Sequence, residues 1–261
     1  MRLQEGSKVG KDGKVIWKAG DGINSQMVFI AQSPSLGIVI AHQGTNKSSA
    51  ASVENDIRMN QVSMHTSLTK IEKKVTGGQQ EQNAEPISVA DGFQNAWLQT
   101  SDAVLSQIEN ILKQNPNQTI TITGHSLGAA ISLFDALAIQ NKFKNSTTKV
   151  ETILFGSPRV GNQQFANLVD EILPNQKHII NQRDPVPHLP FQSFGFRQAS
   201  GEIWIQSSSS TQQSTNTLSC PGQENSDCSN TIHFGQFDLD DHDGPYFGVE
   251  MQCSVQQQQQ R

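Results

Sequence analysis

Short apolar runs along the chain predict β-strands, because residues typical of turns separate them. Residues 118–123, with the sequence QTITIT, alternate the β-branched residues Thr and Ile at period two, which is typical of a strand inside a sheet. Six other segments have the composition of buried or half-buried strands: 14–17, 26–31, 36–42, 151–155, 177–181 and 202–205.

Apolar residues at three- and four-residue spacing predict helices between the later strands. One predicted helix covers residues 91–114, with Asp91 as its capping residue and Pro116 just beyond its end. A second helix starts at Leu127, and a third covers residues 161–173. Strands that alternate with helices predict parallel β-α-β units, so the expected class is α/β.

Polar stretches predict excursions over the surface. Residues 45–90 lose the periodic pattern, and the Ser- and Gln-rich segment 206–219 reads as a mobile loop. The chain has 261 residues, a length that fits one domain, which we place at residues 1–255. Residues 256–261 form a Gln-rich tail that we expect to be disordered.

Charge and hydropathy narrow the function classes. The formal net charge is −5 without long charged runs, so nothing indicates nucleic-acid binding or a polybasic membrane anchor. No apolar stretch approaches the roughly 20 residues of a transmembrane helix. The first residues, MRLQE, lack the apolar core of a signal peptide, which fits a cytosolic protein, a mature form or an incomplete start.

Two of the three cysteines bracket a short polar segment. Cys220 and Cys228 enclose CPGQENSDC, which cannot bury a core of its own, so we expect a disulfide between them. The alternative is a pair of free surface thiols, which are poorly tolerated outside reducing compartments. Cys253 is left without a partner.

The pentapeptide GHSLG, residues 124–128, lies where the strand of residues 118–123 meets the helix that starts at Leu127. A serine between two glycines at a strand-to-helix turn is the pattern of a nucleophile elbow, so Ser126 is a candidate nucleophile. The Leu127 N–H, at the helix N-terminus, would stabilise a developing oxyanion. Because the pentapeptide also arises by chance, an ordinary hydroxyl is the alternative.

A nucleophilic serine needs a histidine and a carboxylate, in the chain order Ser, acid, His on this type of sheet. Asp184 follows the predicted strand 177–181 at its carboxyl end, where catalytic groups gather in open α/β sheets. A turn-forming Asp before Pro185 is the alternative.

The order excludes His42, His65 and His125 as the base, and His125 is expected to face away from Ser126. His178 falls within a predicted strand and reads as a packed residue. We set His188 aside as well, because it stands only four residues after Asp184. His233, with apolar neighbours, and His242, among carboxylates that would raise its basicity, remain as candidates.

Five motifs carry a resemblance to a known family: IVIAHQGT, ITGHSLGAA, FGSPRVGN, RDPVPHLP and DHDGPYFG. In this order and spacing, from about Lys14 to Cys253, they resemble the class 3 lipases, the fungal triacylglycerol lipase family of α/β-hydrolases. The resemblance implies a central, mostly parallel sheet with helices on both faces. It also implies a triad of Ser126, Asp184 and His242.

The resemblance extends to the oxyanion hole, which it assigns to Thr45 and the N–H of Leu127. A Gly-Thr pair at the end of a central strand agrees with that role, although an ordinary turn is the alternative. Two positions depart from the family pattern: Gln43 stands where many members carry Arg, and Ala90 where many carry His.

Residues 48–64, SSAASVENDIRMNQVSM, lie where this family carries a lid. Val53, Ile57 and Val62 stand at helix-like spacing within this polar stretch. Because the apolar stripe is thin, a plain surface helix is the alternative to a gating lid, and we expect only modest interfacial activation.

In the resembling family a cysteine near the place of Cys253 bridges to a helical N-terminal segment, which follows a signal peptide. No cysteine precedes Cys220, so that bridge cannot form in the chain as given. We therefore expect an upstream coding segment that supplies a helix, a cysteine and a signal peptide. As written, the chain is expected to be marginally stable.

The predicted function is hydrolysis of acyl-lipid esters through an acyl-enzyme, with no metal or organic cofactor. The expected partner is a lipid or ester substrate at a lipid–water interface, and the protein is expected to be an extracellular monomer. One alternative is a feruloyl or other soluble-ester esterase on the same fold. Another is a truncated, catalytically silent relative that binds lipid surfaces.

Overall fold

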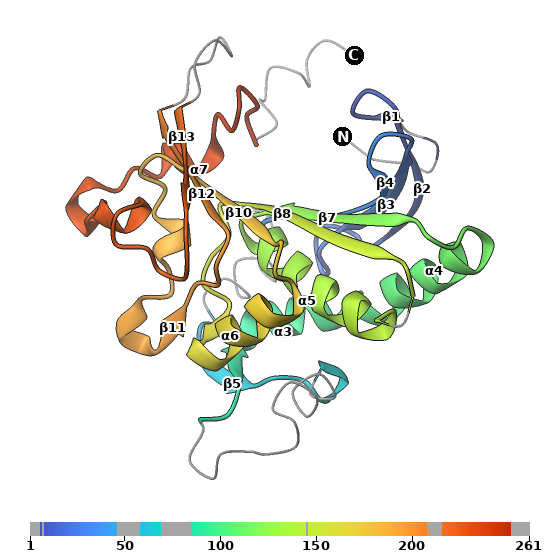
Figure 1. Ribbon diagram of the computed structural model, residues 1–261, viewed down its shortest axis with the longest axis horizontal. Helices are drawn as coiled ribbons and strands as arrows, with labels where there is room; N and C mark the ends of the chain where they lie inside the picture. Colours follow the sequence, from blue (N-terminus) through green and yellow to red (C-terminus); the bar gives the residue numbers. More distant parts are fainter. Residues whose placement is uncertain are drawn as a thin grey trace.

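A nine-stranded sheet runs through the molecule in the order β1-β2-β3-β4-β7-β8-β10-β12-β13 (Figure 1). The computed structural model describes residues 6, 8–45, 58–68, 85–144, 146–207 and 216–251. The strands of the large sheet are β1 (Lys8–Val9), β2 (Gly13–Ala19), β3 (Val28–Ser33), β4 (Gly37–His42), β7 (Thr119–His125), β8 (Lys149–Phe155), β10 (Lys177–Asn181), β12 (Glu202–Ser207) and β13 (Asn216–Cys220). A second sheet joins β11 (Phe196–Arg197), β9 (Gly161–Asn162), β6 (Ser88–Ala90) and β5 (Gln61–Ser63) in that order.

The five central strands, β4, β7, β8, β10 and β12, pair in parallel. Antiparallel strands flank them, with β1 to β3 on one side and β13 on the other. Because parallel strands end at the same edge of a sheet, Ser126 after β7 and Asp184 after β10 lie at one edge. The predicted α/β class is confirmed.

Every strand predicted from the apolar pattern is present, and Lys177–Asn181 has the predicted bounds. The loop predicted over residues 206–219 is wrong at both ends, because residues 206–207 belong to β12 and Asn216–Cys220 forms β13 against it. Four of its five residues are exposed. An edge strand of this kind is held by backbone hydrogen bonds, so its sequence shows no apolar period.

The helices are α3 (Asp91–Leu98), α4 (Ser101–Gln114), α5 (Leu127–Lys142), α6 (Gln163–Ile172) and α7 (Asp240–Asp243). The described part of the chain also has four 3₁₀ turns, all between α6 and α7: η1 (Val186–His188), η2 (Gln192–Phe194), η3 (Ser229–Thr231) and η4 (Phe234–Gln236). Helices α3 to α6 cover one face of the large sheet, and α7 lies on the other side (Figure 1). On that side Tyr246 packs against Ile179 and Ile205. Within the part of the chain described here, no helix has the length and apolarity to cross a membrane.

The single helix predicted over residues 91–114 is wrong, because the chain breaks at Gln99 and Thr100 between α3 and α4. Thr100 takes a non-helical φ of −126° and ψ of −10°. The break allows Trp97 of α3 and Val104 of α4 both to be buried in the main core. Tertiary packing here overrides a continuous helical pattern.

The predicted capping role of Asp91 is also wrong. The position before the helix belongs to Ala90, the last residue of β6, in an extended conformation and without a side-chain cap. Asp91 is the first helical residue, and its carboxylate accepts hydrogen bonds from Arg58 and from Asn95 Nδ2. A strand that runs directly into a helix leaves no separate position for a capping residue.

Residues 48–57 of the predicted lid lie outside the described part of the chain, as do Cys253 and the tail 256–261. Residues 61–63 are described and form strand β5, so the helix-like spacing that includes Val62 is wrong there. Its neighbour in the sheet is β6, which pairs Val62 with Val89. Two strands of three residues are too short to show a period in the sequence.

A buried polar network joins three elements beneath the carboxyl edge of the sheet. Asp135 of α5 is fully buried, as are the side chains of His42 and Trp97. Its Oδ2 lies 2.7 Å from His42 Nε2, and its Oδ1 accepts a hydrogen bond of 2.7 Å from Trp97 Nε1. His42 ends β4, so the network ties this strand to α5 and α3.

Replacing Asp135 with Ala is expected to lower the free energy of unfolding by about 3 to 5 kcal/mol, because it leaves two buried polar partners without an acceptor. Urea denaturation followed by circular dichroism measures the change. The matched control is Glu109→Ala, which removes a carboxylate from an exposed ion pair with Lys142 on the same helical layer and is expected to change stability far less. Equal midpoints for the two variants would contradict the assignment.

Candidate active site

Ser126 lies at the sharp turn between β7 and α5, as the sequence predicts. Its φ of 58° and ψ of −129° are unusual for a residue other than glycine. A Cβ added to Gly124 would lie 2.3 Å from the carbonyl oxygen of Gly128, and one on Gly128 would lie 2.5 Å from that of His42. The two glycines are therefore required by the close approach of the strand and the helix.

Asp184 and His242 meet although 58 residues separate them. His242 Nδ1 lies 2.9 Å from Asp184 Oδ2, and the Val186 N–H donates to Asp184 Oδ1 at 2.8 Å. Asp184 is fully buried, whereas 11% of the His242 side chain is exposed. A carboxylate at Nδ1 favours the tautomer with its proton there, which leaves Nε2 free to accept one.

Tyr246 is a second donor to the same carboxylate oxygen. Its hydroxyl donates to Asp184 Oδ2 at 3.1 Å, and the ring is buried. Burial, and then the negative charge of Asp184, raise the pKa of Tyr246 above its ordinary value, so the phenol stays a donor. The sequence did not predict this contact, although DHDGPYFG contains the tyrosine.

Gly156, the residue after β8, connects Ser126 to the acid and the base. Its neighbour Phe155 accepts a hydrogen bond of 3.0 Å from the Ser126 N–H. Gly156 has a φ of 53°, and a Cβ there would lie 2.8 Å from Tyr246 Oη and 3.0 Å from both Asp184 Oδ2 and His242 Cε1. No larger residue fits, and the signal available in the sequence was a glycine directly after a central strand.

His125 supports His242 from the elbow. Their ring centroids are 4.4 Å apart, and His125 Nε2 lies 2.7 Å from the carbonyl oxygen of His242. Burial, with a smaller effect of His242, lowers the pKa of His125 to about 4. The neutral ring then donates from Nε2 to this carbonyl, a contact the sequence did not predict.

The segment of the predicted oxyanion hole lies beside the serine. A Cβ added to Gly44 would lie 2.7 Å from the His125 carbonyl oxygen and 3.6 Å from Ser126 Cβ, so Gly44, the residue before Thr45, passes close to the elbow. Leu127 is the first residue of α5, where the N–H has no partner within the helix. Gly44 and Leu127 therefore both lie beside Ser126.

The other candidate histidines have different surroundings. His178 is buried in β10, and burial lowers its pKa to about 4. His188 stacks on Phe237 with ring centroids 4.9 Å apart, and burial lowers its pKa to about 4 as well. His233, which the sequence left open as the base, is exposed at the start of η4.

The predicted disulfide between Cys220 and Cys228 is present. These sulfurs and a carboxylate oxygen of Glu202 lie within 4.8 Å of one another, the one group of metal-ligand types found among the described residues. Because the two sulfurs are bonded to each other, the group does not offer the thiolates that a metal ion would need.

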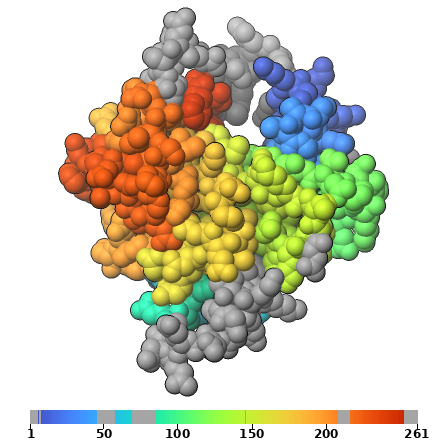
Figure 2. Space-filling view, viewed as in Figure 1, coloured from blue at the N-terminus to red at the C-terminus, as the bar shows by residue number. Residues whose placement is uncertain are grey.

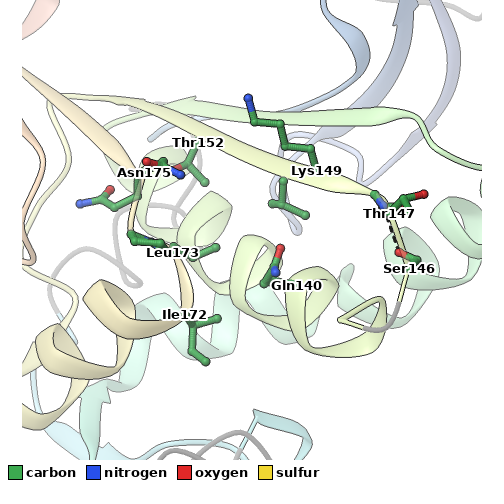
Figure 3. Close-up of a pocket in the computed structure, with 12 residues that line it drawn as sticks. Gln140, Ser146, Thr147, Lys149, Thr152, Ile172, Leu173 and Asn175 are labelled. Atoms are coloured by element: carbon green, nitrogen blue, oxygen red, sulfur yellow. Dashed lines mark hydrogen bonds between the residues drawn. The ribbon is translucent and has the colours of Figure 1, made fainter.

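Two cavities lie at the opposite edge of the sheet, where the parallel strands begin. One, of about 320 Å³, is lined by Gln140 of α5, Thr152 of β8 and Leu173 beyond α6 (Figure 3). The other, of about 410 Å³, is lined by the starts of β4 and β7, including Gly37 and Thr119. Neither contains Ser126, Asp184 or His242 in its lining, so neither is part of this site.

Comparison with known proteins gives a consistent result. The family model for lipase (class 3) matches residues 39–194. A secreted mono- and diacylglycerol lipase of Malassezia globosa is 35% identical over 251 residues, which cover 96% of this chain and 76% of the relative. A secreted mono- and diacylglycerol lipase of Gibberella zeae is 38% identical over 250 residues, covering 92% and 73%.

A solved structure has the same fold. It is described as a triacylglycerol lipase whose catalytic centre is formed by a serine protease triad. It superposes on this chain with a TM-score of 0.73 at 27% identity, covering 92% of this chain and 83% of that one.

Proposed function

This chain belongs to the class 3 lipase family, and from that premise we propose that it cleaves acylglycerol esters with Ser126 as nucleophile, Asp184 as acid and His242 as base. It is an ester hydrolase of the lipase type with the α/β-hydrolase fold. The observation that carries the residue assignment is the hydrogen bond of 2.9 Å between Asp184 and His242. That pair packs against Gly156, next to the residue that binds the Ser126 N–H.

In the proposed mechanism, Ser126 Oγ attacks the ester carbonyl while His242 Nε2 takes its proton. Asp184 keeps the imidazole in the required tautomer and stabilises the imidazolium. The N–H of Leu127 and Thr45 hold the oxyanion. His242 then protonates the leaving alcohol. In deacylation, His242 Nε2 takes a proton from water while the water oxygen attacks the acyl carbonyl, and it then gives this proton to Ser126 Oγ as the fatty acid is released.

The substrate class comes from the relatives. Those at 35% and 38% identity are named as secreted mono- and diacylglycerol lipases, so we propose mono- and diacylglycerols as substrates and an extracellular location. The disulfide between Cys220 and Cys228 agrees with an oxidising compartment.

An aromatic surface patch, formed by Phe191, Phe194, Phe234 and Phe237, supports action at a lipid–water interface. Phe194 and Phe234 are 67% and 77% exposed. Phe191 lies between them, with ring centroids 6.1 Å from Phe194 and 6.4 Å from Phe234, and Phe237 is 6.0 Å from Phe234. Exposed aromatic residues that gather in this way mark a surface that binds apolar partners.

The aromatic surface patch adjoins the two segments that carry the acid and the base. Phe237 stacks on His188, four residues after Asp184, and the next residue, Asp238, donates its N–H to the Arg183 carbonyl. The segment that carries the base belongs to the part of the chain, coloured orange to red, that gathers on one side of the molecule (Figure 2).

The combined variant Phe194→Ser and Phe234→Ser is expected to need about tenfold or more lipid surface for half-maximal diacylglycerol hydrolysis, since burial of one such ring contributes roughly 1.5 to 3 kcal/mol. Its rate on a water-soluble short-chain ester is expected to match that of the parent. Emulsion and soluble-ester assays measure both. The matched control is Leu36→Ser, which removes an exposed apolar side chain at the far edge of the sheet.

Equal parental rates on emulsions and on soluble esters, with no effect of the double variant, would favour a soluble-ester or feruloyl esterase. A parent that reacts with no fluorophosphonate probe would favour the catalytically silent alternative, because labelling requires an activated serine.

A further inference from the structure

The residues that precede the acid and the base are joined directly. Three consecutive residues before Asp184 donate hydrogen bonds to Asp241, the residue before His242. Asn181 Nδ2 donates to the Asp241 carbonyl at 2.9 Å, Gln182 Nε2 to Oδ1 at 3.1 Å and the Arg183 N–H to Oδ2 at 3.1 Å. The Asp241 carboxylate therefore accepts from both the side chain of one residue and the backbone of the next.

Arg183 strengthens the same connection from the solvent side. Its Nη2 lies 2.7 Å from Asp238 Oδ2, and its Nε lies 3.4 Å from Asp241 Oδ2. The Arg183 side chain is 51% exposed, so solvent screens these charges, whereas the Asp241 side chain is only 13% exposed. The hydrogen bonds to Asp241 are therefore the stronger part of the connection.

The backbone conformation of Gln182 is the reason why the hydrogen bonds to Asp241 are needed. It has a φ of 45°, in the left-handed region that residues other than glycine rarely adopt. This conformation turns the chain out of β10 and toward Asp184, two residues later. Two further contacts hold it: the Gln182 N–H donates to the Ile205 carbonyl at 2.7 Å, and Trp204 Nε1 donates to the Gln182 carbonyl at 2.9 Å.

We propose that Asp241 is a positioning residue, which holds Gln182 in its left-handed turn and thereby fixes Asp184 against His242. This inference rests on the proposed triad. In this proposal Asp241 does not contact the substrate or the reacting atoms. It acts by joining the segment before Asp184 to the segment before His242. A catalytic pair displaced by about 1 Å can lose about a hundredfold in rate, so the effect belongs to kcat rather than to substrate binding.

The test is Asp241→Ala, assayed on a soluble ester with the active sites counted by fluorophosphonate titration. We expect kcat per titrated site to fall between ~10-fold and ~100-fold, with KM within about twofold of the parent. The matched control is Asp240→Ala, which removes the exposed carboxylate of the adjoining residue and is expected to keep the parental kcat. Asp241→Asn retains one acceptor oxygen and faces the second donor with an amide group. Its kcat is expected to lie between those of Asp241→Ala and Asp240→Ala.

A second-site variant separates positioning from a general loss of structure. Gln182→Gly adopts the left-handed turn without support from Asp241, so it is expected to recover part of the kcat lost in Asp241→Ala. A kcat within twofold of the parent in Asp241→Ala, or a loss that Gln182→Gly leaves unchanged, would overturn the proposal. Failure of the triad itself is seen separately, as a parent enzyme whose Ser126 does not react with the probe.

Discussion

Ser126→Ala is expected to abolish ester hydrolysis, with kcat falling by about a millionfold, as happens when a serine hydrolase loses its nucleophile. The residue occupies a turn with φ of 58°, between two glycines that permit the close approach of β7 and α5. No other hydroxyl takes the place of Oγ in the proposed mechanism, so the residual rate would come from the binding and oxyanion groups alone. A soluble chromogenic ester measures kcat, and the protein should fold and melt as the parent does.

His242→Ala is expected to cost about the same factor, because nucleophile and base act as one unit. The matched control is His233→Ala, since the sequence alone left His233 open as the base and the structure places it on the surface. This control is expected to retain the parental rate. An inactive His233→Ala beside an active His242→Ala would assign the base to His233 and contradict the pairing of His242 with Asp184.

Local sequence signals predicted the parts of the fold that depend on local pattern. Residues 177–181 form β10 with the predicted bounds, and α5 starts at Leu127 as the apolar stripe indicates. The break at Thr100 was missed, because the apolar period continues through it and only packing of α3 and α4 on the core requires a turn. Strand β13 was missed because its side chains are exposed.

In the candidate site, too, the residues with a local sequence signal were predicted, and those that depend on tertiary contacts were not. Ser126 and Asp184 stand at the ends of predicted strands, so the sheet edge brings them together without further information. Gly156, Tyr246 and Asp241 were missed, since each acts through contacts between segments far apart in the chain. Gly156 contacts residues 28 and more positions away, and no spacing in the sequence reports such a meeting.

Asp184→Asn is expected to lower kcat by about ten-thousandfold, less than the loss of Ser126 or His242. Both oxygens of Asp184 accept hydrogen bonds: Oδ1 from the Val186 N–H at 2.8 Å, and Oδ2 from His242 at 2.9 Å and Tyr246 at 3.1 Å. An amide group must face one of these donors. If it faces His242, the imidazole takes the wrong tautomer, and if it faces Val186, the negative charge that stabilises the imidazolium is still lost.

The measurement is kcat on a soluble ester, with folding checked by thermal melting. Two controls bracket the result. Asp240→Asn removes the same charge from an exposed residue near His242 and is expected to keep the parental rate. Tyr246→Phe keeps the carboxylate and removes one neutral donor, so it is expected to cost about tenfold at most, because such a hydrogen bond contributes about 0.5 to 1.5 kcal/mol. An Asp184→Asn enzyme no slower than Tyr246→Phe would show that the charge of Asp184 is not required, and another carboxylate would then have to serve as the acid.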